Sequence, residues 1–191
     1  MTKKGILGVI LSGGGSARMG RDKALVELNG KPLINHVYER FAPQVDKVII
    51  SGPEGYGLGV ENLADFCGPY KGPIAGLYAV ATCAKDDFPE MKTMVTVPVD
   101  APFLPEDLVE KLLKTTPSVA GTKGQMHPTF ANWGLGIEKT IEAFMDTTKK
   151  GSLHGLARFA GAKTVQFDEE GGFLNINTLG DLNRAKVNPS I

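Results

Sequence analysis

The sequence predicts an α/β fold, a Rossmann-like three-layer α/β/α sandwich on a mostly parallel sheet. Two observations carry this prediction. Short apolar runs rich in β-branched residues alternate with segments of helical periodicity along the chain. Several of these runs end in glycine, serine or proline, where strands of such sheets pass into loops. Alternating strands and helices favour parallel strands whose connecting helices cover both faces of the sheet.

Each expected element follows from its own local pattern. Strands are short apolar runs closed by turn residues, and helices carry apolar residues at helical spacing, as from Pro32 to Phe41. In the first half, the expected elements are strand 6–11, helix 32–41, strand 45–50, loop 55–59, helix 73–84 and strand 94–99. In the second half, they are helix 106–114, strand-like residues 119–133, helix 136–145, helix 153–159, strand 164–167 and helix 179–186.

Polar residues leave three of the expected strands. Ser12, Ser51 and Asp100 follow the strands at 6–11, 45–50 and 94–99. Ligands of open parallel sheets bind beyond the carboxyl ends of the strands. The sequence therefore predicts a ligand site around these three residues.

Composition and charge limit the possible partners. The chain has 191 residues and no visible linker or repeat, so one domain over residues 1–191 is expected. Its 21 basic and 21 acidic residues cancel, so it lacks the global positive field of a nucleic-acid binder. The first apolar run is too short for a membrane span. Cys67 and Cys83 show no zinc spacing and fit free thiols in a reducing compartment. We expect a cytoplasmic protein that binds neither nucleic acid nor membrane.

The glycine-rich stretch at 11–23, LSGGGSARMGRDK, is the most informative part of the chain. Glycines after a strand let the backbone approach a ligand and direct several N–H groups at a phosphate. Arg18 adds a forked cation and Lys23 a point charge. A surface turn with solvated charges is the alternative reading of the glycines alone.

Two common phosphate-binding loops do not fit this stretch. A P-loop needs GxxxxGK followed by Ser or Thr, but Arg21 and Asp22 follow Gly20. A dinucleotide fingerprint, GxGxxG, counted from Gly13 would place its last glycine at Arg18. Both a P-loop NTPase and a Rossmann oxidoreductase are therefore disfavoured.

The same stretch resembles the molybdenum cofactor guanylyltransferase family, within the larger group of sugar-nucleotide-type pyrophosphorylases. Further motifs carry the resemblance along nearly the whole chain. They are NGKPL at 29–33, GPIAGL at 72–77, PVDAPFL at 98–104, HPTF at 127–130, and NINT at 175–178 with Asp181-Leu182. Five matches in the family's order make the resemblance specific. It implies the nucleotide-diphospho-sugar transferase type of fold, and transfer of GMP from GTP to molybdenum-bearing molybdopterin, with release of pyrophosphate.

The resemblance also implies roles for the glycine-rich stretch. Residues 11–13 should lie against the nucleotide, with Gly13 and Gly14 giving backbone donors. Lys23 should neutralise phosphate charge, and Arg18 should stabilise the leaving pyrophosphate. The alternatives are a solvated lysine and a structural salt bridge. The predicted nucleotide-binding residues are Leu11, Ser12, Gly13, Gly14, Lys23, Ser51, Asp65 and Asp100.

Asp100 is the strongest single candidate for catalysis and for metal binding. It follows a buried run at the expected carboxyl end of a strand. Mg²⁺ prefers few carboxylates together with water and phosphate oxygens, so Asp100 would hold Mg²⁺ against the triphosphate. A cap for the helix starting near Pro105 is the alternative reading. By resemblance, Asp65 contacts the nucleotide, and Ser51 stands where relatives often carry a longer Asn.

Three residues of the second half are candidates for the acceptor side or for supporting a metal. Asn175 and Asn177 alternate on a short, extended run, so both should face one side. His127 fits acid–base chemistry or a structural turn before Pro128 equally well. His36 and His154 are expected at the surface or in satisfied positions. Trp133 is expected in the core.

Alternatives to the guanylyl reaction remain open at this point. Cytidylyl transfer to the same pterin, or nucleotidyl transfer to a sugar phosphate, would use a similar loop and sheet. A non-catalytic nucleotide sensor of the same fold is a different class, which the intact Arg18, Lys23 and Asp100 disfavour. The resemblance also implies transient contacts with cofactor-synthesis proteins and apo-molybdoenzymes.

Overall fold

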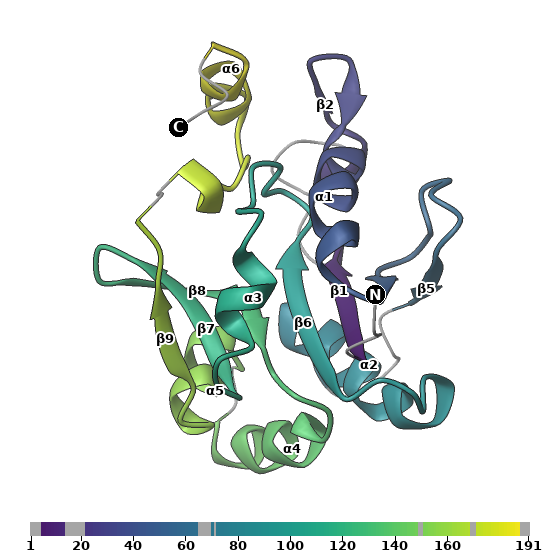
Figure 1. The fold of residues 1–191 in the computed structure, drawn as a ribbon, viewed down its shortest axis with the longest axis vertical. Helices are drawn as coiled ribbons and strands as arrows, with labels where there is room; N and C mark the ends of the chain where they lie inside the picture. The colour runs from purple at the N-terminus through teal and green to yellow at the C-terminus, as the bar shows by residue number, and fades with distance from the viewer. Residues whose placement is uncertain are drawn as a thin grey trace.

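A seven-stranded sheet in the order β5-β4-β1-β6-β8-β7-β9 forms the centre of the molecule (Figure 1). A computed structural model describes residues 5–13, 22–64, 70, 72–148, 151–168 and 171–187. The strands of this sheet are β1 (Ile6–Leu11), β4 (Lys47–Ser51), β5 (Glu61–Leu63), β6 (Thr93–Pro98), β7 (Ser118–Thr122), β8 (Gln125–Asn132) and β9 (Lys163–Gln166). A two-stranded hairpin pairs β2 (Glu27–Leu28) with β3 (Lys31–Pro32).

The sheet is mostly parallel, as the alternation of strands and helices predicts. β1 pairs in parallel with β4 and β6, and the outer pairs β4–β5 and β7–β9 are also parallel. β8 pairs antiparallel with both β6 and β7. The predicted α/β class with a mostly parallel sheet is confirmed.

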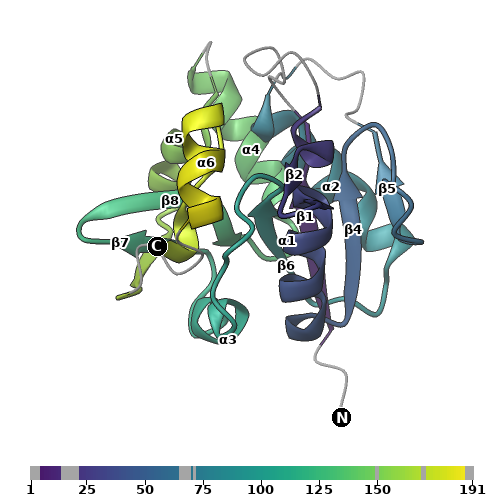
Figure 2. The ribbon, with the colours of Figure 1, turned by 90° about the horizontal axis from the view of Figure 1, so that it is seen from above.

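Helices cover both faces of the sheet (Figure 2). The described helices are α1 (Leu33–Phe41), α2 (Pro73–Asp87), α3 (Leu108–Leu112), α4 (Ile137–Thr147), α5 (Leu153–Phe159) and α6 (Leu179–Val187). Figure 2 shows α1 and α3 on one face and α2, α4 and α5 on the other. Short 3-10 turns are η2 (Lys23–Leu25), η3 (Ala42–Gln44) and η4 (Gly171–Phe173). The arrangement is the predicted three-layer sandwich.

β1 contributes to the core on both faces because its side chains alternate. Leu7 and Val9 belong to the apolar cluster under α2, α4 and α5, whereas Ile10 belongs to the cluster under α1 and α3. At Gly8 a side chain would meet the ring of Phe41 at 2.8 Å, so glycine allows α1 to lie close to the strand. This packing fixes the strand whose carboxyl end enters the candidate site.

The structure corrects two of the expected elements and adds a strand, β5, that was not expected. The strand-like stretch 119–133 is an antiparallel hairpin, β7–β8, whose turn places Lys123 and Gly124 at φ +41° and +81°. The predicted helix 106–114 is the shorter α3. β5 lacks an apolar pattern because it is a three-residue edge strand, with two of its residues exposed. Strand 6–11 and helix 153–159 have the expected bounds.

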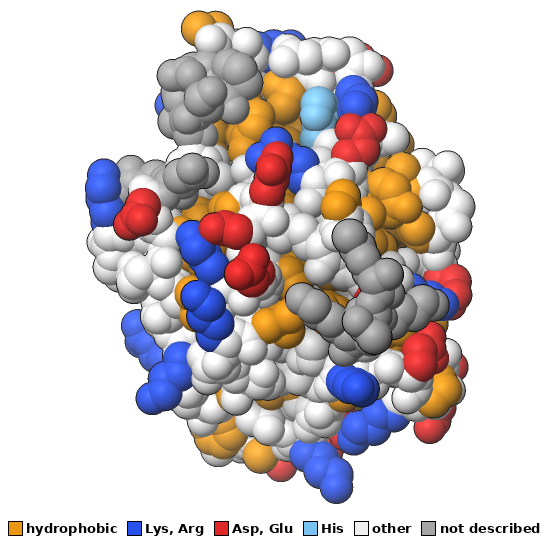
Figure 3. Space-filling view, in the orientation of Figure 1, with side chains coloured by type: hydrophobic (Ala, Val, Ile, Leu, Met, Phe, Trp, Pro, Cys, Tyr) orange, Lys and Arg blue, Asp and Glu red, His pale blue; other side chains and the backbone are white. Residues whose placement is uncertain are grey.

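Charges of both signs are interspersed on the face that α1 and α3 cover (Figure 3). Lys111 pairs with Asp107 at 2.8 Å, and Arg40 lies 4.0 Å from Glu106. This mixing agrees with the formal net charge of zero. Among the described residues, no helix is both long enough and apolar enough to cross a bilayer.

Candidate active site

Three neighbouring parallel strands end together at one edge of the sheet. β4, β1 and β6 lie side by side, and Ser51, Ser12 and Asp100 lie at or just beyond their carboxyl ends. Ser12 N donates to the Ser51 carbonyl at 2.8 Å, and Val99 N donates to the Leu11 carbonyl at 3.1 Å. The strands thus stay in register one residue past their ends, where the switch-point rule places ligands.

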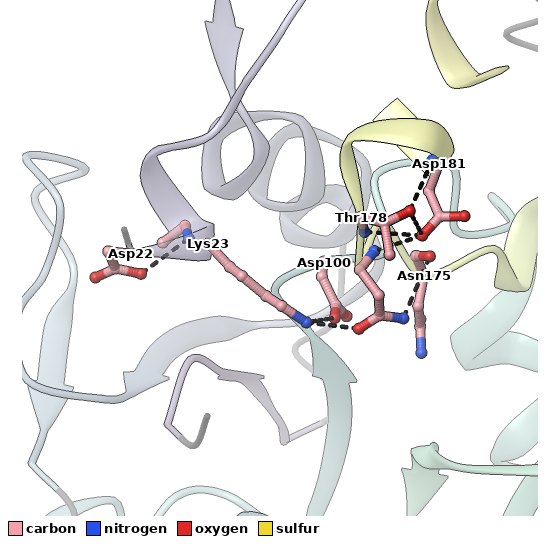
Figure 4. Close-up of polar contacts among 8 residues, drawn as sticks. Asp22, Lys23, Asp100, Asn175, Thr178 and Asp181 are labelled. Atoms are coloured by element: carbon pink, nitrogen blue, oxygen red, sulfur yellow. Dashed lines mark hydrogen bonds and ion pairs between the residues drawn. The ribbon is translucent and has the colours of Figure 1, made fainter. Parts of the chain in front are cut away.

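A lysine, an aspartate and an asparagine meet at this edge (Figure 4). Lys23 Nζ donates to Asp100 Oδ2 at 3.0 Å and to Asn177 Oδ1 at 2.6 Å. The side chains of Lys23 and Asp100 are 16% and 13% exposed, so the ion pair is largely shielded from water. Lys23 precedes Asp100 by 77 positions and Asn177 by 154, so only the fold brings the three together.

The backbone around each of these residues is held by its own contacts. Asp22 caps η2, since its Oδ1 accepts from Ala24 N at 2.9 Å, and this fixes the turn that carries Lys23. The Asp100 carbonyl accepts from Ile176 N at 2.8 Å, which ties residues 174–177 to the end of β6. The cluster is therefore preorganised from three separate segments.

Asn175 carries an unpaired acceptor beside this cluster. Its Oδ1 is buried and has no hydrogen-bond partner among the residues that the structure describes, whereas its carbonyl accepts from Asn177 Nδ2 at 3.4 Å. Buried polar atoms are nearly always paired in native proteins, so an orphan acceptor calls for an explanation. A ligand, a metal ion or its water would supply the missing partner.

Two adjoining pockets share Asn175. One, of about 140 Å³, is lined by Gly13, Lys23 and Asp100, with Pro73 and Thr129 on its other sides. The second, of about 420 Å³, is lined on one side by Asn175 and Asn177, and on another by His127 and Phe173. The two pockets, lined by both polar and apolar residues, extend from the strand ends to the β7–β8 hairpin.

A family model for the MobA-like NTP transferase domain matches residues 8–163 of the chain. This chain belongs to that family. The match spans the strand ends, the Lys23–Asp100 pair and the β7–β8 hairpin. The predicted family, and with it the predicted nucleotidyltransferase class of enzyme, is confirmed.

Individual relatives of this NTP transferase agree with the assignment. The chain is 41% identical over 187 residues to a molybdenum cofactor guanylyltransferase of Rhodobacter capsulatus, covering 95% of each chain. It is 25% identical to molybdopterin-guanine dinucleotide biosynthesis protein A of Archaeoglobus fulgidus, with TM-score 0.72 and coverage of 97% and 98%. A 4-diphosphocytidyl-2C-methyl-D-erythritol synthase of Anaerococcus prevotii shares the fold, with TM-score 0.72 at 14% identity and coverage of 97% and 96%.

The donor set of this NTP transferase suits a hard divalent cation. Among the residues that the structure describes, no three His, Cys, Asp or Glu side chains gather as a metal cage. Asp100 supplies one carboxylate, and Asn175 and Asn177 supply amide oxygens. Mg²⁺ needs only one or two carboxylates when substrate phosphates and water complete its shell. One carboxylate beside an orphan amide oxygen therefore fits Mg²⁺.

The structure gives different information on the remaining predicted residues. Ser51 is buried at 1% exposure, and its carbonyl accepts from Ser12 N. Its contact with the nucleotide stays a prediction. Gly14, Arg18 and Asp65 lie outside the described residues, as does Cys67. Trp133 is in the core at 2% exposure, as expected, and its Nε1 donates to Thr96 Oγ1 at 3.1 Å.

The histidines have structural partners in this NTP transferase. His127 Nε2 lies 2.7 Å from Thr122 Oγ1, and its ring stacks on Phe173 at 5.0 Å between centroids. Burial, with a smaller contribution from His154, lowers the pKa of His127 below its ordinary value and favours the neutral ring. His36 and His154 each contact a backbone carbonyl. This geometry favours a packing role for His127 at the rim of the larger pocket.

Three residues that hold the site have no role among the expectations from the sequence, although Asp22 and Asp181 stand in the motifs of the resemblance. Asp22 and Tyr56 hydrogen-bond to each other at 2.9 Å, and Asp181 accepts from Asn177 N at 3.0 Å and from Thr178 N at 2.8 Å. Asp181 had a local signal, because Thr178-x-x-Asp181 is a capping-box pattern at the start of α6. Tyr56 had none, since its partners lie 34 and 44 positions away.

Replacing Asp181 with alanine is expected to destabilise the fold by about 1 kcal/mol, the usual effect of a lost helix cap. Burial alone would raise the pKa of Asp181, but hydrogen bonds from Thr178 and Asn177 and the nearby Arg184 lower it. The contribution of Asp181 to the free energy of unfolding is therefore present above the pKa that it has in the unfolded chain. It is lost as the pH falls through the lower pKa that Asp181 has in the folded protein. Urea unfolding of wild type and Asp181→Ala at neutral and acid pH measures this contribution. An equal loss of stability at both pH values would contradict the expected pH dependence, and Asp107→Ala is the surface control.

Proposed function

We propose that this chain transfers GMP from GTP to the terminal phosphate of molybdopterin bearing molybdenum, with release of pyrophosphate. The observation that carries the proposal is the Lys23–Asp100–Asn177 cluster at the carboxyl ends of β1 and β6. The name of the 41% identical relative supports guanylyl transfer rather than another nucleotidyl transfer. Known enzymes of this kind rely on positioning and charge stabilisation, which such a cluster provides.

The nucleotide would lie across the strand ends. Leu11, Ser12 and Gly13 would lie against the nucleotide, with Gly13 and Gly14 as backbone donors to the triphosphate, and Arg18 would stabilise the leaving pyrophosphate. Asp65 and Ser51 are proposed on the nucleoside side. A phosphate oxygen of the acceptor attacks the α-phosphorus in line, and the bond from the α-phosphorus to the bridging oxygen of pyrophosphate breaks. The acceptor phosphate is already ionised, so no general base is needed.

Lys23 is held in place before substrate arrives and changes partners when it binds. In the structure its ammonium neutralises Asp100. When the triphosphate enters, its charge offers Lys23 a stronger partner than one carboxylate, and Asp100 becomes available for a cation. We propose Asp100 as a ligand of Mg²⁺, with Asn175 and Asn177 supporting it through their amide oxygens. When bound, Mg²⁺ supplies charge neutralisation at the phosphate oxygens.

The larger pocket is the proposed acceptor site. It adjoins the cluster through Asn175 and Asn177, and its far wall carries His127 stacked on Phe173. A polar, partly aromatic wall suits a pterin with a phosphate end. We further propose a single domain over residues 1–191, a cytoplasmic location, and transient hand-over contacts with cofactor-synthesis proteins and apo-molybdoenzymes.

Pyrophosphate release tests the proposal. Purified protein with Mg²⁺ and molybdenum-bearing molybdopterin is given GTP, CTP or ATP, and nucleotide binding is measured in parallel by calorimetry. We expect selective binding and turnover of GTP. Preference for CTP would assign the enzyme to cytidylyl transfer, and pyrophosphate release with a sugar phosphate in place of the pterin would change the acceptor. Nucleotide binding without pyrophosphate release would identify a sensor instead of an enzyme.

A further inference from the structure

A single tyrosine hydroxyl connects the two ends of the glycine-rich stretch. Tyr56 OH donates to Asp22 Oδ2 at 2.9 Å and lies 2.9 Å from Ser12 Oγ, which can then donate to it. Ser12 follows β1, and Asp22 precedes η2, so the two residues flank 13–21 in the chain. Tyr56 itself comes from the separate loop between β4 and β5.

The connection continues to Lys23. Asp22 uses its other oxygen, Oδ1, to cap η2 through Ala24 N at 2.9 Å. Lys23 is the first residue of that turn, and its ammonium extends from there to Asp100 (Figure 4). Because both oxygens of the Asp22 carboxylate are hydrogen-bonded, its orientation is fixed. The Tyr56 hydroxyl thereby holds the turn that carries Lys23 in position.

The backbone of Tyr56 is in a conformation that bulky residues rarely adopt. Its φ is +50°, in the left-handed region, where a tyrosine side chain is unfavourable. Such strain persists only where the surroundings hold it, and it concentrates at functional sites. The neighbouring turn supports it, since Leu58 N donates to the Gly55 carbonyl at 3.1 Å.

The hydroxyl keeps its proton throughout the range in which the enzyme would work. Burial is the main cause that raises the pKa of Tyr56 to about 12; the hydrogen bond with Ser12 opposes this shift, and the hydrogen bond to Asp22 and the charges of Asp22 and Glu54 add to it. Tyr56 is therefore a hydrogen-bond donor to Asp22 at neutral pH.

We propose that Tyr56 is a positioning residue for the nucleotidyl transfer: its hydroxyl joins Ser12 and Asp22 and thereby holds Lys23 at the strand ends. This inference rests on the proposed function. The Tyr56 hydroxyl contacts Ser12 and Asp22, and it acts through these two residues, which flank 13–21 in the chain.

Tyr56→Phe tests the inference, because it removes the hydroxyl and keeps the ring. We expect kcat to fall about tenfold, since an ångström of misplacement at a catalytic group costs up to about 10²-fold. KM for GTP and the melting temperature should change little. Tyr78→Phe is the matched control, because Tyr78 OH also donates to a carboxylate, Glu142, at 2.7 Å but on the exposed side of α2. An equal fall in the control would overturn the inference, as would wild-type kcat for Tyr56→Phe.

Coupling to Lys23 separates positioning from a merely structural effect. In a Lys23→Ala background, Tyr56→Phe should lower kcat no further, whereas a second tenfold fall would overturn the inference. If Tyr56→Phe does not fold, Asp22→Asn, which alters the acceptor side of the same contact, replaces it in the same cycle.

Amide exchange at Ala24 gives a readout that needs no substrate. Losing the Tyr56 contact loosens Asp22, so Ala24 N–H should exchange several-fold faster in Tyr56→Phe, and unchanged exchange would overturn the inference. Absence of turnover in wild type with every nucleotide would instead refute the proposed function, and the exchange result distinguishes the two failures.

Discussion

Asp100→Ala is expected to lower kcat roughly 10³-fold while the protein stays folded, an effect at the upper end of those seen when one transition-state contact is removed. Asp100 is the carboxylate of the cluster. Among the described residues, no group of three His, Cys, Asp or Glu side chains could hold a metal ion in its place. Without it, the triphosphate keeps Lys23 but loses the proposed Mg²⁺ ligand. The measurement is pyrophosphate release at saturating GTP over a Mg²⁺ titration.

Two control variants make the Asp100 result specific. Asp100→Asn keeps the shape and an oxygen donor but removes the charge, so it should recover only part of the rate at high Mg²⁺. Asp107→Ala removes a half-exposed acid paired with Lys111 and should leave turnover unchanged. A kcat within about fivefold of wild type for Asp100→Ala would refute the metal role, since lost metal ligands and their supports typically cost 10- to 100-fold or more.

Lys23→Ala is expected to lower kcat/KM for GTP roughly 10²-fold, because a positive charge in a shielded site is lost from the triphosphate. The same variant should bind Mn²⁺ or Mg²⁺ more tightly without nucleotide. In the structure the ammonium lies 3.0 Å from Asp100 and 2.6 Å from Asn177, where it competes with a cation for the same oxygens. Calorimetry with the metal alone measures this second effect.

Lys23→Ala is expected to lower turnover but to raise metal affinity, and these opposite directions distinguish the expected result from misfolding. A misfolded variant would lose both nucleotide turnover and metal affinity. Lys31→Ala is the matched control, because Lys31 is also a lysine in an ion pair, 2.7 Å from Glu39, but on the exposed side of α1. Like Lys23, it lies in one of the motifs that carry the resemblance, NGKPL at 29–33. Equal or weaker metal binding in Lys23→Ala would contradict competition between the ammonium and the cation.

Local patterns in the sequence were sufficient for the α/β class and for the parallel strands β1, β4 and β6, whose ends form the candidate site. β1 is a six-residue, fully buried run, so its pattern predicts its bounds without tertiary information. Asp100 could be placed at a carboxyl end for the same reason. The expectation of one strand-like stretch overlooked the β7–β8 turn, in which Gly124 is a turn residue but Lys123, also at positive φ, gives no turn signal.

The candidate site divides in the same way. Motifs at three places in the chain indicated Lys23, Asp100 and Asn177, which lie in η2, just beyond β6 and just before α6. Neither the contacts among them nor the unpaired Asn175 oxygen could be read from the sequence, since hydrogen bonds between residues up to 154 positions apart depend on the packing of whole elements. Tyr56 is the clearest example of a contact that the sequence does not predict, since nothing near it in the chain indicates Ser12 and Asp22 as its partners.

The sequence by itself determined the α/β class, the strand ends and the residue types that nucleotidyl transfer needs, because these depend on short-range periodicity and on motif chemistry. Only the tertiary structure decided which of those residues meet. It tied the segment before α6 to the end of β6 through the bond from Ile176 N to the Asp100 carbonyl, and it placed Tyr56 between Ser12 and Asp22. The physical reason is that a side-chain contact between distant segments is a property of the packed sheet and helices, whereas a strand or helix is largely a property of its own residues.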